Sequence, residues 1–166
     1  QHPTISQVLL GKVGHGKIRI KPNIQKLEGH TVYFEDGSSE DFDVIIYSTG
    51  YHITFPFFDK TFIDPKDNEM PLYHKVVHPE HRNLFFLGLI QPLGAIMPLS
   101  EQQAIWVAKI LTGKVKLPDT RTMQRVIIQD REAMRRRYQS STRHTVQVDF
   151  YPYKKLIQDE IRARAV

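Results

Sequence analysis

The 166-residue sequence contains no cysteine. This absence excludes disulfide bridges, thiolate metal ligands and a cysteine nucleophile, and it suits a reducing compartment. A long uninterrupted apolar run is also missing, because Gln91, Pro92 and Gly94 break the most apolar window, residues 83–99. A membrane-spanning helix needs about 20 consecutive apolar residues. We therefore expect a cytoplasmic chain without a membrane span, and the sequence leaves membrane association of a longer protein open.

Complete catalytic and nucleotide-binding motifs are missing as well. The stretch Gly11–Gly16, "GKVGHG", begins like a glycine-rich phosphate loop, but Arg19 stands where a third glycine would fall. No strand is predicted before this stretch and no helix after it, so we interpret it as a plain turn. The sequence contains neither a Walker loop nor a serine nucleophile elbow.

The histidines and carboxylates do not predict a catalytic or metal site. His78 and His81 lie on either side of a proline, and no helix would project both onto one face. Glu40, Asp41 and Asp43 lie beside a predicted turn, where we expect their carboxylates to be solvated. We therefore nominate no metal ligand and no catalytic residue.

The composition is that of a globular protein, with 40% apolar and 25% charged residues. The 23 Lys and Arg residues outnumber the 18 Asp and Glu residues, which gives a net charge of +5. Four arginines cluster in one segment with helical spacing, at Arg131, Arg135, Arg136 and Arg137. Two interpretations stay open: a solvated helix face, which we favour, and a docking face for an anionic partner such as nucleic acid.

Hydrophobic patterning predicts strands in the first half of the chain. Lys17–Lys21 alternates charged and apolar residues, and Thr31–Glu35 is β-branched and aromatic. The Asp36-Gly37 pair that follows favours a tight hairpin turn into a strand over residues 42–47. A second apolar strand is predicted at Leu84–Ile90, and the irregular, aromatic segment 55–67 is expected to pack against the core.

Helices are predicted in the second half. Ser100 and Gln103 have capping-box spacing, which predicts a helix beginning near Ser100 and ending near Gly113. A second helix is predicted from residue 118, and its apolar side is formed by Met123, Val126, Ile127 and Met134. Residues 146–150 are expected to be extended, and a short helix is expected over residues 154–164.

Both predicted apolar strands end in small residues. The first runs into "STGY" after "DVIIY", and the second into "QPLG" just before the predicted helix. Small residues at the carboxyl end of a strand let a flat or phosphorylated ligand approach, and a helix N-terminus supplies partial positive charge. These residues alone leave two interpretations open, a dinucleotide or flavin edge and a plain α/β core.

Longer segments resemble the flavin-containing monooxygenase family. Four stretches match the family's segments in the right order and cover nearly the whole chain: "QHPTISQVLLGKVGHGKIRIKPNI", "DVIIYSTGYHITFPFFD", "NLFFLGLIQPLGAIMPLSEQQAIWVAKILTGKVKLPD" and "TVQVDFYPY". The family's two glycine-rich fingerprints and its aromatic-Gly-His signature lie upstream of everything matched. The chain therefore looks like the carboxyl-terminal portion of such an enzyme.

The resemblance implies an α/β fold, namely the carboxyl-terminal part of a flavoprotein with two Rossmann-like dinucleotide-binding domains. Residues 1–41 would join the nicotinamide domain back to the flavin domain, residues 42–118 would complete the FAD-binding domain, and residues 119–166 would form a helical extension. Without the upstream fingerprints, the isolated chain is expected to be inactive and to hold FAD weakly.

The resemblance also implies the chemistry. NADPH would reduce FAD, dioxygen would add to the flavin as a peroxide, and one oxygen would pass to a soft nitrogen or sulfur nucleophile on a small molecule. The implied partner is the rest of the enzyme, not nucleic acid. The expected cofactor-binding residues are Thr49, Gly50, Tyr51, Gln91, Pro92, Gly94, Pro98 and Ser100. The alternative is a non-catalytic binding or assembly module that uses the basic helix.

Overall fold

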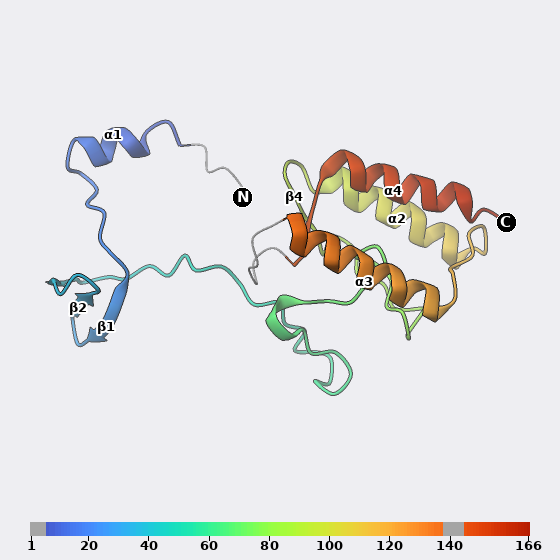
Figure 1. Cartoon of the computed structure of the whole chain (residues 1–166), viewed down its shortest axis with the longest axis horizontal. Helices are drawn as coiled ribbons and strands as arrows, with labels where there is room; N and C mark the ends of the chain where they lie inside the picture. Colours follow the sequence, from blue (N-terminus) through green and yellow to red (C-terminus); the bar gives the residue numbers. More distant parts are fainter. Residues whose placement is uncertain (1–5, 138–144) are drawn as a thin grey trace. The chain divides into compact units, whose positions relative to one another are not determined.

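A computed structural model describes residues 6–137 and 145–166, so the first five residues of the amino-terminal family segment lie outside the described part. The described residues form two compact units that divide between Gly50 and Tyr51 (Figure 1).

The first unit contains a short helix and a three-stranded sheet. Helix α1 spans Leu9–Gly14, and strands β1, β2 and β3 span Ile24–Glu28, Thr31–Phe34 and Ser39–Asp41. The strands pair antiparallel in the order β1-β2-β3. Gly37 turns the β2–β3 hairpin with φ at +81°, a conformation that glycine adopts without steric cost, so the hairpin predicted at Asp36-Gly37 is confirmed.

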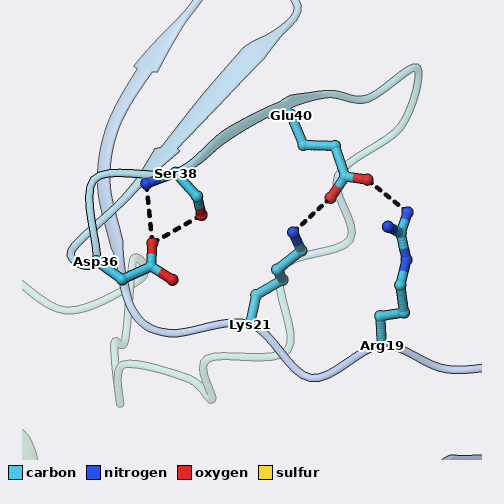
Figure 2. Close-up of polar contacts among 5 residues, drawn as sticks. All are labelled: Arg19, Lys21, Asp36, Ser38 and Glu40. Carbon is cyan, nitrogen blue, oxygen red and sulfur yellow. Dashed lines mark hydrogen bonds and ion pairs between the residues drawn. The ribbon is translucent and has the colours of Figure 1, made fainter.

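Surface polar contacts hold the segment before β1 against this hairpin (Figure 2). Asp36 accepts hydrogen bonds from the backbone N–H and the hydroxyl of Ser38, at 3.0 and 2.7 Å, and these bonds lower the pKa of Asp36. Glu40 forms ion pairs with Lys21, whose Nζ lies 2.8 Å away, and with Arg19, and the interaction with Lys21 is the main reason that the pKa of Glu40 is lowered. Exposed pairs of this kind contribute little to stability but fix the local path of the chain.

Three predictions in this unit are wrong. Lys17–Lys21 is irregular rather than a strand, and "GKVGHG" is largely the short helix α1 rather than a plain turn. The strand that pairs with β2 is Ser39–Asp41, whereas residues 42–47 have no regular structure. A strand depends on a neighbour for its hydrogen bonds, and in the described part of the chain no strand pairs with residues 42–47.

The run Val44–Tyr47 is consequently exposed although it is apolar. Ile46 is 84% exposed, and Val44 and Tyr47 are also largely exposed. A run of consecutive bulky apolar residues is typical of strands covered on both faces. In this chain neither face of the run is covered.

The second unit is a helical layer with one small parallel ribbon. Helices α2, α3 and α4 span Met97–Leu111, Thr120–Arg137 and Phe150–Ala163, and α2 lies alongside α4 (Figure 1). Strands β4 (Gln91–Pro92) and β5 (Gln147–Val148) pair in parallel, each shortly before one of these two helices. The short 3₁₀ helix η1 spans Lys66–Asn68.

Helices α2 and α4 also end together. Val115, just after α2, bridges to Ala165, just after α4, so the two strand–helix segments run in the same direction. The helix boundaries follow known signals: Asp119 caps α3 by accepting from Thr122 N–H at 2.8 Å, and Gly113 follows α2 with φ at +71°.

The predicted beginning of α2 is wrong by three residues. The helix begins at Met97, and Pro98 occupies its first turn, where proline is well tolerated. Ser100 therefore lies inside the helix, and its hydroxyl donates to Ile96 C=O at 3.2 Å instead of capping. Gln103 is fully buried and belongs to the core, so Ser100 and Gln103 do not form a capping box despite their spacing.

The main core lies between the three helices and the turn at residues 73–77. Its fully buried side chains include Tyr73, Leu99, Trp106, Met123 and Ile157. A smaller cluster forms around Ile63, Leu72 and Phe86, and the irregular aromatic segment packs on it through Phe55 and Phe58, as expected from the sequence.

The second predicted apolar strand, Leu84–Ile90, is also wrong. The segment makes one isolated bridge, from Phe85 to Val77, and it turns at Gly88 with φ at +74°. Its apolar side chains are used in the two core clusters rather than on the two faces of a sheet.

We predict that Met123→Ala destabilises the second unit by about 2–5 kcal/mol, because it opens a cavity at a site with 0% exposure. Ile128→Ala is the matched control on the same helix, since Ile128 is 58% exposed, and it should change stability by less than about 0.5 kcal/mol. Urea unfolding followed by far-ultraviolet circular dichroism measures both variants. Equal effects of the two substitutions would contradict the placement of α3.

Candidate functional site: the loop before helix α2

Five of the predicted site residues lie in β4, in the loop that joins β4 to α2, and in the first turn of α2. Gln91 donates its N–H to Val146 C=O at 2.8 Å, which fixes the beginning of the loop on β5. Pro92 is buried, whereas Gly94 is exposed, with φ at +122° and no atom within 4 Å of a Cβ built on it. The loop therefore presents an open backbone surface without an obstructing side chain at Gly94.

The first turn of α2 adjoins this surface. No side chain caps the helix at Ile96, and Pro98 is exposed within the first turn. The N-terminal turn of a helix carries partial positive charge and unsatisfied N–H groups. The loop and the helix start together form a sterically open edge at Gly94, flanked by the exposed apolar side chains of Leu93 and Met97.

The other three predicted residues lie elsewhere in the chain. Thr49 and Gly50 close the first unit in an exposed, irregular stretch, and Gly50 has φ at +94°. Tyr51 opens the second unit and is 97% exposed. The strand expected to end at these residues does not form in this chain.

The sequence analysis missed Asn68, which holds the segment after Tyr51. Its side chain donates to Tyr51 C=O at 3.1 Å and accepts from Ile53 N–H at 2.6 Å. Asn68 is buried with φ at +60°, a conformation that asparagine tolerates better than most residues. In the sequence Asn68 simply follows the irregular segment 55–67, and no pattern there indicates that its side chain is buried.

A second missed feature is a buried polar network behind the loop. Gln103 Oε1 accepts from Gly88 N–H at 2.8 Å, and Gln103 Nε2 donates to the Tyr153 hydroxyl at 2.7 Å. That hydroxyl donates in turn to His74 C=O at 2.6 Å. The network joins the loop region, α2 and α4 through groups that water does not reach.

Glu160 on α4 is the centre of a separate polar cluster. It accepts from the Tyr73 hydroxyl at 2.5 Å, pairs with Arg164, and lies 3.8 Å from His74 Nε2. Burial opposes ionisation of Glu160, but the interactions with His74, Tyr73 and Arg164 outweigh it and lower the pKa of this carboxyl. Burial also raises the pKa of the Tyr73 hydroxyl, which remains a hydrogen-bond donor.

The basic run on α3 is paired with acidic groups of this same chain. Arg131 and Arg135 meet the carboxylate of Glu69, and Arg137 lies 2.5 Å from Asp149. These contacts favour the interpretation of a charge-compensated surface helix over a docking face for an anionic partner.

The open edge carries no obvious acid or base. The predicted site residues there are amide, proline, glycine and hydroxyl types, which do not transfer protons readily, and the exposed residues between them include Leu93, Ile96 and Met97. Within residues 6–137 and 145–166, no cluster of three or more His, Asp and Glu side chains is placed to hold a metal ion.

Comparison with known proteins shows the family of the chain. The model of the flavin-binding monooxygenase-like family matches residues 1–165. The chain belongs to this family. It is 41% identical to rat flavin-containing monooxygenase 5 over 167 residues, a match that covers 99% of this chain and 31% of the rat protein. It is 34% identical to the chimpanzee N-oxide-forming dimethylaniline monooxygenase 2, again over 99% of this chain and 31% of the relative.

Solved structures confirm the α/β fold class. The S-allyl-L-cysteine S-oxygenase of Allium sativum superposes with a TM-score of 0.68 at 28% identity, over 86% of this chain and 34% of that one. Tmm from a Pelagibacter strain gives a TM-score of 0.62 at 23% identity, over 82% of this chain and 31% of that one, and supports the fold alone. The chain thus spans about a third of the length of its relatives.

The helices of this family member also bear on the membrane question. Among the residues that the structure describes, no helix combines the length and the apolar character needed to cross a bilayer.

We predict that Gly88→Ala is more destabilising than Gly113→Ala, although both glycines have φ near +70°. Each substitution forces alanine into the left-handed region, at about 1–2 kcal/mol. At Gly88 the new Cβ would also lie 3.3 Å from Ser100 Oγ, whereas nothing lies within 4 Å at Gly113. Urea unfolding measures the difference, and Ser100→Ala combined with Gly88→Ala should recover part of it. An equal loss at both positions would contradict the close packing of the loop on α2.

We predict that the stabilising role of Glu160 depends on pH. Because its pKa is lowered by folding, its contribution is present above the ordinary carboxyl pKa of about 4.3 and is lost as the pH falls through the lower value of the folded state. The difference in unfolding free energy between the wild type and Glu160→Gln should therefore be largest near neutral pH and shrink in acid. Urea unfolding at a series of pH values measures it, and a difference independent of pH would contradict the assignment.

Proposed function

We propose that this chain is the carboxyl-terminal portion of an FAD- and NADPH-dependent monooxygenase that uses dioxygen to oxygenate soft nitrogen or sulfur nucleophiles on small molecules. The observation that carries the proposal is the open edge of β4 and α2, in a chain that matches the family over its whole length. The names of the relatives support both substrate classes, since one forms N-oxides and one oxygenates sulfur.

FAD fits the residues that the structure offers. A Cβ at Gly94 would meet open space, the first turn of α2 lacks a side-chain cap, and Gln91, Gly94 and Pro98 are exposed. These residues, with Pro92 and Ser100, would hold one edge of the cofactor, and Thr49, Gly50 and Tyr51 remain part of the proposed cofactor-binding set. When bound, FAD would supply redox chemistry in which NADPH is the reductant, one oxygen atom of dioxygen enters the substrate and the other leaves as water. The residues of this chain bind, orient and exclude water.

The proposal includes a dependence on the rest of the enzyme. Helix α2 buries Leu99, Trp106 and Val107 in the core, yet its opposite side is also apolar and exposed. The exposed apolar side chains on α2 are Met97, Ala104, Ile105, Ala108 and Leu111. Glu101 is the charged residue among them, and an exposed surface that is otherwise apolar is normally covered by another protein segment. The missing two-thirds of the enzyme would supply that cover, as well as the neighbours that Val44–Tyr47 lacks.

The domain assignment and location follow from the same proposal. Residues 1–41 would connect the nicotinamide domain to the flavin domain, residues 42–118 would complete the FAD-binding domain, and residues 119–166 would form a helical extension. We also propose a cytoplasmic location, which the cysteine-free composition suits.

We predict that the intact protein from its native source has a mass well above 19.4 kDa and a yellow flavin spectrum, and that it oxidises NADPH faster when amines or sulfides are added. In that protein, Gly50→Val should lower the flavin content by crowding the strand end. Gly29→Val is the matched control, because Gly29 also has positive φ and lies in a hairpin turn of the first unit. Visible absorbance per mole of protein measures both. A colourless protein of 19.4 kDa, with or without added FAD, would overturn the proposal.

A further inference from the structure

We infer that Gln103 and Tyr153 are positioning residues that fix the cofactor-binding loop from behind without touching the cofactor. This inference rests on the proposed function, because it concerns the same loop, residues 88–94. Its structural basis is the pair of hydrogen bonds that Gln103 makes in the core, one to Gly88 and one to Tyr153.

Gln103 is buried in the core of the second unit. The side chain has 0% exposure, and each end of its carboxamide has one partner in the core. A buried carboxamide costs free energy unless it is hydrogen-bonded, and leucine would fill similar space without that requirement. The polar side chain thus has a specific use, which is to hold the Gly88 N–H at one defined position and orientation.

The loop backbone is held at two points, Gly88 and Gln91. Gln103 holds the beginning at Gly88, where φ is +74° and no side chain restricts the backbone on its own. Residues 146–148 hold the backbone again at Gln91, because Val146 C=O accepts from Gln91 N–H at 2.8 Å and β5 pairs with β4. Between these anchors Ile90 is buried, so the backbone that leads to Gly94 begins from a fixed point.

Both of these contacts depend on residues 146–153 in the carboxyl-terminal region. Strand β5 leads directly into α4, and Tyr153 lies in the first turn of α4. The Tyr153 hydroxyl accepts from Gln103 and donates to His74 C=O, so it orients the carboxamide that holds Gly88. One short segment, residues 146–153, therefore supports the loop at both points. The carboxyl-terminal region serves the cofactor site although none of its residues belongs to the predicted binding set.

Tyr73 provides a matched control. Tyr73 and Tyr153 are both buried, both donate a hydroxyl hydrogen bond, and burial raises the pKa of both. The Tyr73 hydroxyl, however, donates to Glu160 and has no hydrogen bond to Gln103 or to the loop. Replacing either tyrosine by phenylalanine removes one buried hydroxyl, and only one of the two replacements disturbs the loop.

The experiment compares Tyr153→Phe, Gln103→Met and Tyr73→Phe in the intact protein at a temperature where all remain folded. We expect Tyr153→Phe and Gln103→Met to raise the FAD dissociation constant by about three- to tenfold, the equivalent of one buried hydrogen bond. They should also change the visible circular dichroism of bound flavin. Tyr73→Phe should leave both quantities unchanged while lowering the urea midpoint to a similar extent. Equal effects of the two tyrosine variants on flavin would overturn the inference.

A readout that needs no flavin separates this inference from the proposed function. Hydrogen exchange at the Gly88 and Gln91 amides should accelerate in Tyr153→Phe and not in Tyr73→Phe. If the wild type binds no FAD but this difference appears, the anchoring of the loop stands and the proposed function fails. If the wild type binds FAD and the exchange rates do not differ, the anchoring is wrong and the proposed function stands.

Discussion

The second unit depends on one buried carboxamide. Gln103 has no access to water, so its donor and acceptor must be satisfied inside the protein, and the partners available are Gly88 N–H and the Tyr153 hydroxyl. Satisfying them forces the loop before β4, helix α2 and the first turn of α4 into a single arrangement. Apolar packing around Trp106 stabilises that arrangement but does not select it, because hydrophobic contact is not directional.

The same constraint explains why two strand–helix segments distant in sequence act as one support. Strands β4 and β5 pair in parallel before α2 and α4, and Val115 and Ala165 bridge after them. The Gln103 to Tyr153 hydrogen bond joins the two helices between these ends. The loop that the proposed function uses for FAD lies at the strand end of this pair, where small residues leave the backbone accessible. Rigidity at the back of the loop and openness at its front are thus properties of different residues.

The sequence was sufficient where the determinants are local. The Gly37 turn and the capping of α3 by Asp119 depend on residues within a few positions, and both were predictable. The strands predicted at residues 42–47 and 84–90 failed because strands need neighbours, and no described strand lies beside them. Gln103 was misinterpreted for another reason: its spacing from Ser100 is that of a capping box, and spacing cannot distinguish a surface cap from a buried anchor.

These failures are themselves informative about the protein. Val44–Tyr47 has the composition of a covered strand and lacks a cover, and α2 has a core-like surface on its outer side. A sequence selected to be a complete small domain would carry polar residues at those positions, because exposed apolar side chains favour association. The contacts that would satisfy both segments are absent from a chain that spans 31% of its relatives. The open edge at Gly94 is a further uncovered surface of the same kind, since Leu93 and Met97 on either side of it are also largely exposed.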